Sequence, residues 1–243
     1  QRRYYSANTR NAPSGRQSVV PCTDSRSLLA QLYFDSNSVQ FGAFKISAHE
    51  TDPTLPLTPL YLHYPKDSAP GSELLPQMFQ IIGELFYEII QTNYIAFDKI
   101  AGIPAGADPF AKTTAEHFSQ PTEILLNFDK KVNKNERRYF SGPIKGSLKK
   151  GDTVLVLDDH TSGGYNKSLF IELIESMDAN VTDVLTVVDR EQGASDFLRS
   201  RGVKLHSIFT ISELLNIYRS NGSISNQQYD QVTEYVQHNQ IKL

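Results

Sequence analysis

The chain of 243 residues has one cysteine, Cys22, and no tryptophan. A single cysteine excludes an internal disulfide framework and a zinc site built from several cysteines, so we expect a cytoplasmic protein. A membrane-spanning helix needs about 20 consecutive apolar residues. The most apolar segment, residues 74–90, is interrupted by glutamine and glutamate. We therefore expect no membrane partner.

The chain also lacks a strong charge of either sign. Its formal net charge of -3 gives no overall attraction to nucleic acid. Neither a helix-turn-helix pattern nor interleaved basic and aromatic residues are present, so nucleic acid is not an expected partner. The first 24 residues have no apolar periodicity and no apolar stretch of a signal peptide. We expect an irregular arm over residues 1–24 and a single domain over residues 25–243.

The start of that domain has the pattern of one helix followed by two strands. Apolar periodicity predicts a helix over residues 25–33, and alternation predicts strands over residues 39–46 and 60–64. A loop rich in proline and threonine separates the two strands. Together these elements predict a small N-terminal hood over about residues 25–66.

From residue 72 onward, helices and apolar strands alternate. The expected helices cover residues 75–90, 108–118, 167–177 and 194–201, and the expected strands cover residues 99–103, 123–128, 153–157, 184–188 and 205–208. A basic loop over residues 129–150 interrupts the order. Two helices end the chain, and a capping box at Ser225 to Gln228 precedes the second. This order predicts an α/β fold with a mostly parallel sheet flanked by helices.

Two acidic residues, Asp158 and Asp159, follow the apolar strand over residues 153–157, and the turn Thr161-Ser162-Gly163-Gly164 comes after His160. Ligands of open α/β sheets bind at such carboxyl ends of strands. The turn offers hydroxyl and backbone N–H groups to a phosphate, and the next helix adds its positive dipole end. Carboxylates accept hydrogen bonds from ribose hydroxyls and hold Mg²⁺ through water. The pattern predicts a ribose-phosphate site.

Other interpretations of this segment remain open. The two acids are also compatible with a solvated turn at a strand end. An ordinary turn into a helix explains the glycines but not the acids before them. His160 can donate a hydrogen bond to a polyanion, although a lone histidine in a turn is more often structural or simply exposed.

The segment resembles the signature for phosphoribosyl pyrophosphate (PRPP) in type I phosphoribosyltransferases, where two acids precede a Thr-Ser/Ala-Gly turn. Other stretches resemble the orotate phosphoribosyltransferases, including the transferase domain of UMP synthase, in the same order along the chain. They are Phe41 to Phe44, Thr58 to Tyr61, Ala101 to Pro104, Val188 to Gly193 and Gly202 to Ile208. The resemblance covers roughly residues 28–237. It implies the type I phosphoribosyltransferase fold, a parallel-sheet core with a small N-terminal hood.

The resemblance implies transfer of a 5-phosphoribosyl group from PRPP to orotate, a step of UMP biosynthesis that uses Mg²⁺. It implies that the residues from His160 to Gly164 bind PRPP, with the 5-phosphate on the turn, and that Asp158 and Asp159 hold the ribose hydroxyls. Mg²⁺ would arrive with PRPP and reach either acid through water. Arg190 and Phe44 would bind orotate, because a guanidinium matches a planar carboxylate. For Arg190 the alternative is a surface ion pair with a neighbouring acid.

The basic loop has a role in the family as well. Its lysines Lys130, Lys131 and Lys134 supply positive charge for the leaving pyrophosphate, although a solvated loop explains them too. In the resembled family this loop closes over the site of the neighbouring subunit, which implies a homodimer. The resemblance also implies fusion or association with orotidine 5′-phosphate decarboxylase.

The chain departs from the family pattern at several positions. One residue, not two, separates the acidic pair from Thr161, and Tyr165 and Asn166 replace small hydroxyl residues. Ser47 replaces a lysine, and Ala105 replaces a tyrosine. These changes leave two alternatives to an orotate transferase. One is a catalytically impaired protein of the same fold that binds a nucleotide or phosphoribosyl ligand, and the other is a transferase for another base.

Overall fold

The structure is a computed structural model that describes residues 24–45, 54–66, 68–104, 106–126, 128–132, 138–141 and 147–240. The expected arm over residues 1–24, apart from Asp24, lies outside the described residues, as do Ser47, Ala105 and Lys134. Among the helices of the described part, none is long and apolar enough to cross a membrane.

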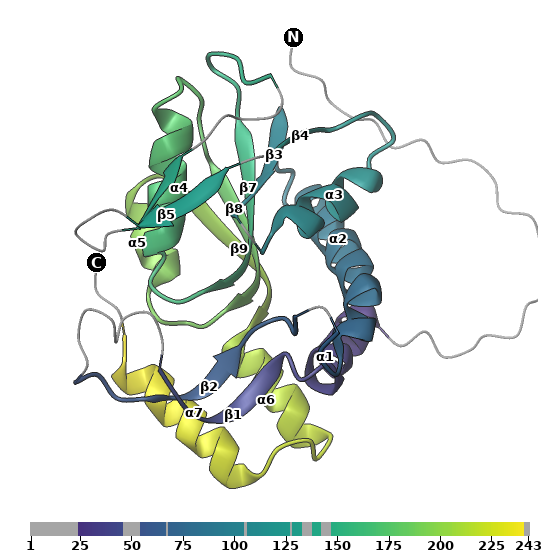
Figure 1. Cartoon of the computed structure of the whole chain (residues 1–243), viewed down its shortest axis with the longest axis vertical. Helices are drawn as coiled ribbons and strands as arrows, with labels where there is room; N and C mark the ends of the chain where they lie inside the picture. Colours follow the sequence, from purple (N-terminus) through teal and green to yellow (C-terminus); the bar gives the residue numbers. More distant parts are fainter. Residues whose placement is uncertain are drawn as a thin grey trace, which may run out of the picture.

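The expected hood contains helix α1 (Ser25–Asp35) and strands β1 (Val39–Phe44) and β2 (Thr58–Leu62). The Asp24 side chain accepts a hydrogen bond from the Arg26 backbone and so caps α1. The two strands pair antiparallel, as predicted, with an irregularity between Phe41 and Phe44. They form a separate two-stranded sheet at one end of the molecule (Figure 1).

The main sheet has five parallel strands in the order β4-β3-β7-β8-β9. They are β3 (Lys99–Gly102), β4 (Glu123–Leu125), β7 (Val154–Thr161), β8 (Asp183–Asp189) and β9 (Lys204–Thr210). This confirms the predicted parallel sheet. All five strands end at the same edge, and β3, β7, β8 and β9 are each followed by a helix.

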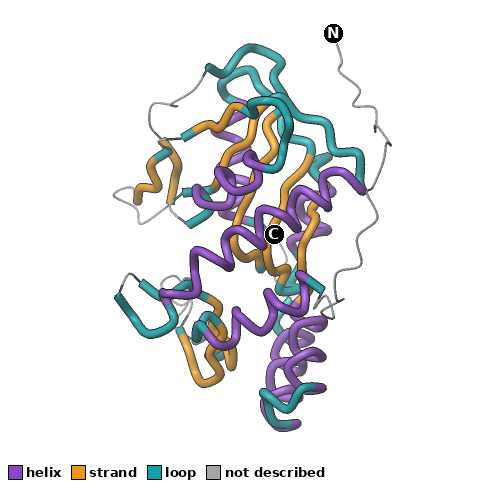
Figure 2. Tube along the Cα trace, turned by 90° about the vertical axis from the view of Figure 1, so that its right-hand side faces the viewer, coloured by secondary structure: helices purple, strands orange, loops and turns teal. Residues whose placement is uncertain are grey.

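The helices outside the hood also follow the prediction. After the short 3₁₀ turn η2 (Ser72–Leu74) they are α2 (Leu75–Thr92), α3 (Asp108–Glu116), α4 (Tyr165–Glu175), α5 (Ala194–Ser200), α6 (Ile211–Ser220) and α7 (Asn226–His238). Viewed from the right-hand side of Figure 1, helices lie over one face of the sheet (Figure 2). The capping box before α7 is present, because Ser225 and Gln228 each accept a hydrogen bond from the other's backbone.

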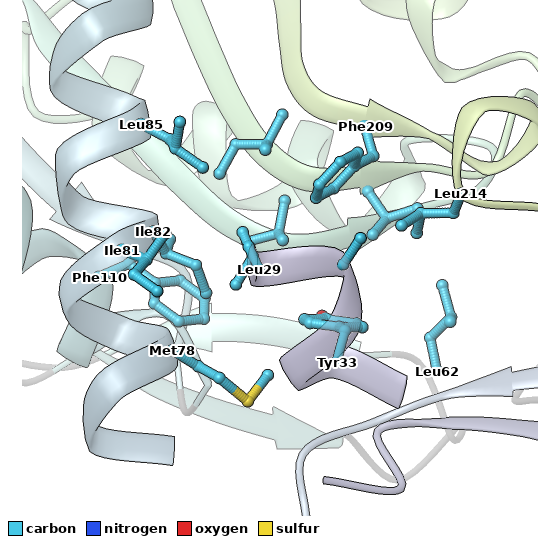
Figure 3. Close-up of a cluster of buried hydrophobic side chains, with 14 of the residues drawn as sticks. Leu29, Tyr33, Leu62, Met78, Ile81, Ile82, Leu85, Phe110, Phe209 and Leu214 are labelled. Atoms are coloured by element: carbon cyan, nitrogen blue, oxygen red, sulfur yellow. The ribbon is translucent and has the colours of Figure 1, made fainter. Parts of the chain in front are cut away.

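Alternating side chains of β7 build two apolar cores, one on each face of the sheet. Leu155 and Leu157 join the core formed with α1, α2 and α6, part of which is drawn in Figure 3. Val154 and Val156 join the second core, with Phe170 of α4. Burying one such side chain contributes about 1.5–3 kcal/mol. Both faces of the strand are therefore covered, as expected of a parallel sheet.

The two C-terminal helices pack on the hood, which the sequence did not predict. The Tyr218 hydroxyl of α6 donates a hydrogen bond of 3.0 Å to the Ala30 carbonyl of α1. Gln192, in the loop after β8, donates a bond of 2.9 Å to the Asn239 carbonyl just beyond α7. The end of the chain thus connects the hood to the edge of the sheet where the strands end (Figure 1).

The prediction of a loop over residues 129–150 was wrong in part. This segment contains the antiparallel hairpin of β5 (Asp129–Val132) and β6 (Arg138–Ser141). The ring centroids of Phe128 and Phe140 lie 4.7 and 5.2 Å from that of Phe170 on α4. One buried aromatic residue at each strand is too weak an apolar pattern to predict a hairpin from sequence.

Candidate functional site

Strand β7 continues through the acidic pair, whereas the sequence predicted that it ends at Leu157. His160 pairs with Val188 and Thr161 pairs with Asp189 of β8. Backbone pairing with β8 therefore fixes Asp158 to Thr161 as strand residues despite their polar side chains. The four side chains lie at the carboxyl end of the central strand, where the predicted ribose-phosphate site was expected.

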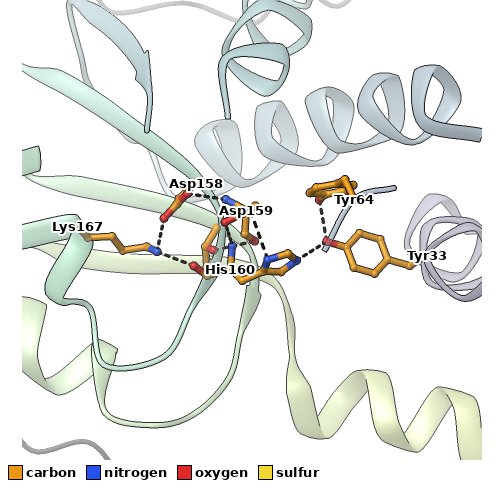
Figure 4. A network of polar contacts seen from close by, with 7 residues as sticks. Tyr33, Tyr64, Asp158, Asp159, His160 and Lys167 are labelled. Atoms are coloured by element: carbon orange, nitrogen blue, oxygen red, sulfur yellow. Dashed lines mark hydrogen bonds and ion pairs between the residues drawn. The ribbon is translucent and has the colours of Figure 1, made fainter. Parts of the chain in front are cut away.

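Asp158 is buried and paired with a lysine that the sequence analysis missed. The Lys167 ammonium lies 2.6 Å from Asp158 Oδ2 and 2.9 Å from the His160 carbonyl oxygen (Figure 4). Burial raises the pKa of Asp158 to about 6, with the Lys167 charge opposing the rise. Removing one partner of a buried ion pair typically costs about 3–5 kcal/mol.

Asp159 is the more open of the two acids. Its side chain is 34% exposed, and Oδ2 lies 3.4 Å from His160 Nδ1. Oδ1 accepts a hydrogen bond of 2.6 Å from the His160 backbone. Burial opposes ionisation, but the charge and hydrogen bonds of His160 hold the pKa of this carboxyl below its usual range. Asp159 is therefore an ionised acceptor that faces the open side of the site.

His160 joins the strand to the hood. Its Nε2 atom lies 2.7 Å from the Tyr33 hydroxyl, which donates a bond of 2.7 Å to the Tyr64 hydroxyl (Figure 4). The Tyr64 ring stacks on the imidazole at a centroid distance of 5.8 Å. Burial is the main cause that raises the pKa of both tyrosines, so both hydroxyls stay protonated. The sequence analysis identified neither tyrosine.

The turn after β7 has the features of a phosphate cradle. Thr161 is buried, and its Oγ1 atom has no hydrogen-bond partner among the described residues. Gly164 has a φ of 88°, a conformation that side chains disfavour, and α4 begins at the next residue. Gly163 is buried as well, and the Ser162 carbonyl accepts a bond of 3.0 Å from the Ala194 backbone. The turn thus presents a buried hydroxyl and a helix N-terminus together.

Arg190 follows β8 and lies beside this turn. Its backbone N–H donates a bond of 2.8 Å to the Thr161 carbonyl. Its side chain is 8% exposed and donates a bond of 3.0 Å to Thr58 Oγ1 of the hood. Burial lowers the pKa of its guanidinium, whose Nε atom has no partner in the described part of the chain. The alternative of a surface ion pair was wrong, because the guanidinium is buried against β2.

Phe44 pairs with Thr58 of β2, the residue that Arg190 contacts, but its side chain meets another residue. Its ring stacks on Tyr61 at a centroid distance of 5.5 Å. Tyr61 is exposed and alternates along β2 with Thr58 and Leu60, the two residues that Arg190 contacts. The structure therefore does not bring the Phe44 ring together with Arg190.

The predicted basic residues are described only in part. The Lys131 side chain is 50% exposed and lies 3.4 Å from Asp129. Lys130 lies in β5, but its side chain and all of Lys134 are outside the described residues. The hairpin packs on α4 through Phe140. The exposed Lys131 therefore lies on an element adjacent to the helix that follows the turn from Thr161 to Gly164.

Comparison with known proteins identifies the family. Residues 71–206 match the phosphoribosyl transferase domain. The chain belongs to the phosphoribosyltransferase family. This confirms the resemblance found in the sequence, and the match includes β3, β7, β8 and the turn before α4.

Three known proteins are similar to this chain over more than half of its length. The chain is 28% identical to uridine 5′-monophosphate synthase of Bos taurus over 213 residues, 88% of this chain and 41% of the bovine protein. It is 31% identical to orotate phosphoribosyltransferase of Pyrococcus furiosus over 140 residues, 57% of this chain and 73% of that protein. The structure of Leishmania donovani UMP synthase has the same fold, with a TM-score of 0.70, 24% identity and coverage of 87% of this chain and 42% of that one. The chain therefore spans less than half of either synthase.

As a family member the chain was expected to use Mg²⁺, but its acidic pair does not fit a protein-bound divalent cation. The ammonium of Lys167 already lies against Asp158, and Asp159 accepts from His160. Within the described residues no group of three His, Cys, Asp or Glu side chains could hold a metal. A magnesium ion at this pair would face a fixed positive charge at short range. Mg²⁺ is compatible with the site only as a part of the substrate.

Proposed function

We propose that this phosphoribosyltransferase transfers the 5-phosphoribosyl group of PRPP to orotate, giving orotidine 5′-monophosphate and pyrophosphate. The observation that carries the proposal is that the carboxyl ends of β7 and β8 lie side by side. There the Arg190 backbone N–H donates a hydrogen bond to the Thr161 carbonyl, beside Asp159. This arrangement supports the proposal, because a carboxylate that can accept from ribose hydroxyls, a turn that can hold a phosphate and a buried guanidinium lie at one edge of the sheet. The orotate transferases among its relatives support the choice of acceptor.

The 5-phosphate of PRPP binds at the turn from Thr161 to Gly164. The unpartnered Thr161 hydroxyl donates to a phosphate oxygen, and the positive end of the α4 dipole favours the anion. Ser162 and His160 flank this cradle.

The ribose lies over Asp159. Its carboxylate accepts hydrogen bonds from ribose hydroxyls and stabilises the positive charge that develops on the sugar while the bond from C1 to pyrophosphate breaks. Asp158 acts indirectly, because its carboxylate accepts a hydrogen bond of 2.9 Å from the Asp159 backbone N–H. The electron pair of the broken bond leaves with pyrophosphate, and the orotate nitrogen forms the new bond to C1.

Arg190 binds the orotate carboxylate. Its Nη2 atom is held by Thr58, and its Nε atom supplies a second donor for a planar acceptor. A buried, weakly solvated guanidinium binds such an anion more strongly than an exposed one. The expected role of Phe44 is kept as a prediction that requires a change in the hood, since its ring stacks on Tyr61.

Pyrophosphate leaves over the basic hairpin. Lys131, with Lys130 and Lys134, neutralises the leaving group, and PRPP enters as its Mg²⁺ complex. Among the described residues the Lys131 ammonium is exposed and paired only with Asp129, and we propose that it is available to a second molecule. We propose a homodimer in which the hairpin of one protomer serves the site of its partner.

The proposal also includes a partner enzyme and a location in the cell. The chain spans 41% of the bovine UMP synthase, and we propose that orotidine 5′-phosphate decarboxylase works with it as a fused or separate partner. A cytoplasmic location is part of the same proposal, because a chain with Cys22 as its single cysteine forms no internal disulfide.

One observation favours a second candidate function. Lys167 already neutralises Asp158, so a single acid remains to stabilise the charged sugar. A protein of this fold that binds a phosphoribosyl ligand without transferring it needs no more than the turn and Asp159. Binding of ligand without turnover distinguishes this candidate from the transferase.

Calorimetry with PRPP and Mg²⁺ tests the shared part of both candidates. Thr161→Val removes the hydroxyl with little change of shape and should weaken binding about 10- to 100-fold, as expected for a hydrogen bond to a charged group. Thr113→Val is the matched control, because that hydroxyl is bonded to carbonyls within α3. Parent-like affinity in a folded Thr161→Val variant would show that phosphate does not bind at this turn.

A further inference from the structure

Lys167 is a charged residue on the apolar side of a helix. It shares the buried face of α4 with Phe170, Ile171 and Ile174 at helical spacing, and its side chain is 3% exposed. A lysine is rarely buried to this degree unless it is paired. Here Asp158 and the His160 carbonyl accept from two of its three N–H groups.

Without the lysine, a phosphoribosyl ligand would meet an Asp158 carboxylate with no positive charge against it. Adjacent carboxylates repel the phosphates of such a ligand, and the repulsion is strong because the site is largely buried. A cation between like charges relieves such repulsion, and a divalent ion can serve as that cation. In this chain the ammonium group fills that position permanently, because it projects from α4 toward the end of β7.

We propose that Lys167 is the built-in counter-ion of the acidic pair, so that a phosphoribosyl ligand binds at the turn between β7 and α4 without a divalent cation on the protein. The ligand in this statement rests on the proposed function. Lys167 acts as a positioning residue: it holds Asp158 away from the ligand and ties the His160 carbonyl to the first turn of α4. Asp159 is left as the acid that contacts the sugar.

The other charged groups around the pair agree with this assignment. His160 lies against Asp159, and Asp189 at the end of β8 is close enough to Lys167 for its charge to lower the pKa of that carboxyl, which burial raises. Three acids therefore share one buried ammonium and one imidazole. Removing the ammonium leaves an excess of negative charge that a divalent cation can offset.

The test uses ribose 5-phosphate, which lacks the pyrophosphate that carries Mg²⁺ into the site. Its affinity is measured by calorimetry in EDTA and in millimolar Mg²⁺, at about pH 8.5, because loss of the Lys167 charge raises the pKa of Asp158 and a high pH favours its ionised form. The variants are Lys167→Met, Lys167→Arg and the double variant Lys167→Met/Asp158→Asn. Lys99→Met is the matched control, because Lys99 pairs with Glu123 at the opposite edge of the sheet.

The parent and Lys99→Met should bind ribose 5-phosphate with affinities that differ by less than about twofold between the two buffers. Lys167→Met should bind about tenfold more weakly in EDTA and recover in Mg²⁺. Lys167→Arg and the double variant should be as indifferent to Mg²⁺ as the parent, since each keeps the net charge of the parent site. A parent that needs Mg²⁺, or a folded Lys167→Met variant indifferent to it, would overturn the proposal while phosphoribosyl binding stands.

A ligand-free measurement separates this proposal from the proposed function. Mg²⁺ alone should leave the unfolding temperature of the parent unchanged and raise that of Lys167→Met. Equal responses of the two proteins would overturn the role of the lysine. If the parent bound no ribose 5-phosphate in either buffer, the proposed function would fail, and this thermal comparison would still decide the counter-ion role. If Lys167→Met does not fold, the comparison uses the parent and the double variant. Mg²⁺ should leave the unfolding temperature of both unchanged, and a rise in the parent would overturn the role of the lysine.

Discussion

The Nε2 atom of His160 lies 2.7 Å from the hydroxyl oxygen of Tyr33. This contact joins the carboxyl end of β7 to α1, two elements more than a hundred residues apart along the chain. The same hydroxyl donates to Tyr64, which follows the hood strand β2. The position of the hood over the acidic pair therefore depends on a short chain of polar groups as well as on apolar packing.

Tyr33→Phe should destabilise the protein by about 1–3 kcal/mol, because the imidazole and the Tyr64 hydroxyl lose a buried partner. Urea unfolding measures the change. Tyr229→Phe deletes the same atom from a partly buried tyrosine whose hydroxyl bonds to Asn216 at the surface, and it should change the free energy of unfolding by less than about 0.5 kcal/mol. Equal effects of the two substitutions would show that the contact between β7 and the hood contributes no more to the free energy of unfolding than the contact of Tyr229 does.

The stability of the protein should depend on the proton of Asp158. Burial raises the pKa of this carboxyl to about 6, whereas an unfolded chain has a value near 3.9. A carboxyl with a raised pKa in the folded state stabilises that state fully below about pH 4 and loses this contribution as the pH rises to about 6.

Asp158→Asn has no such proton and serves as the reference. The free energy of unfolding of the parent, relative to this variant, should fall by up to about 3 kcal/mol from pH 4 to pH 7. Denaturant unfolding of both proteins across this range checks the prediction, since groups that the two share largely cancel. A difference that is constant or grows with pH would contradict the assignment.

Arg190→Gln should weaken orotate binding about 10- to 100-fold while leaving the affinity for ribose 5-phosphate unchanged, because the proposal assigns the guanidinium to the orotate carboxylate and not to the phosphate. Arg199→Gln makes the same change at an exposed residue paired with Asp196 and should alter neither affinity. Calorimetry with the two ligands separates the outcomes. An equal loss for both ligands in Arg190→Gln would assign this arginine a structural role in holding the hood.

The order of strands and helices could be predicted from sequence because most of the elements bury an apolar stripe. The end of β7 could not, since Asp158 to Thr161 are polar and remain in the strand only through pairing with β8. The hairpin of β5 and β6 was missed because, among its described side chains, the buried apolar ones are Phe128 and Phe140.

The site was predicted where the chemistry is local in sequence. Asp158, Asp159 and the turn from Thr161 to Gly164 stand together in the chain, so their motif was visible. Lys167 offered a signal that was not used: it occupies an apolar position of α4, seven residues before Ile174. Tyr33 offered none, because its contact with His160 depends on how the hood closes over the sheet.

The protein should be a homodimer, because the exposed charge of the hairpin around Lys131 has no buried anion of its own protomer to neutralise among the described residues. Sedimentation velocity at micromolar concentration measures the association state. Lys131→Gln should leave the association state unchanged and lower the turnover of PRPP with orotate, since the lysine serves the leaving group. A parent that sediments as a monomer would show that no hairpin of a partner protomer serves the site.

The central claim is tested most directly by incubating the parent protein with PRPP, Mg²⁺ and orotate and measuring the loss of orotate together with the products. The account predicts orotidine 5′-monophosphate and pyrophosphate in equal amounts, at a rate below the ordinary value of about 10 s⁻¹ because the turn is shortened and Asp158 is held by Lys167. Asp159→Asn should lower that rate at least about 100-fold. A folded parent that binds PRPP and orotate but forms no orotidine 5′-monophosphate would contradict the claim and leave the chain a binding protein.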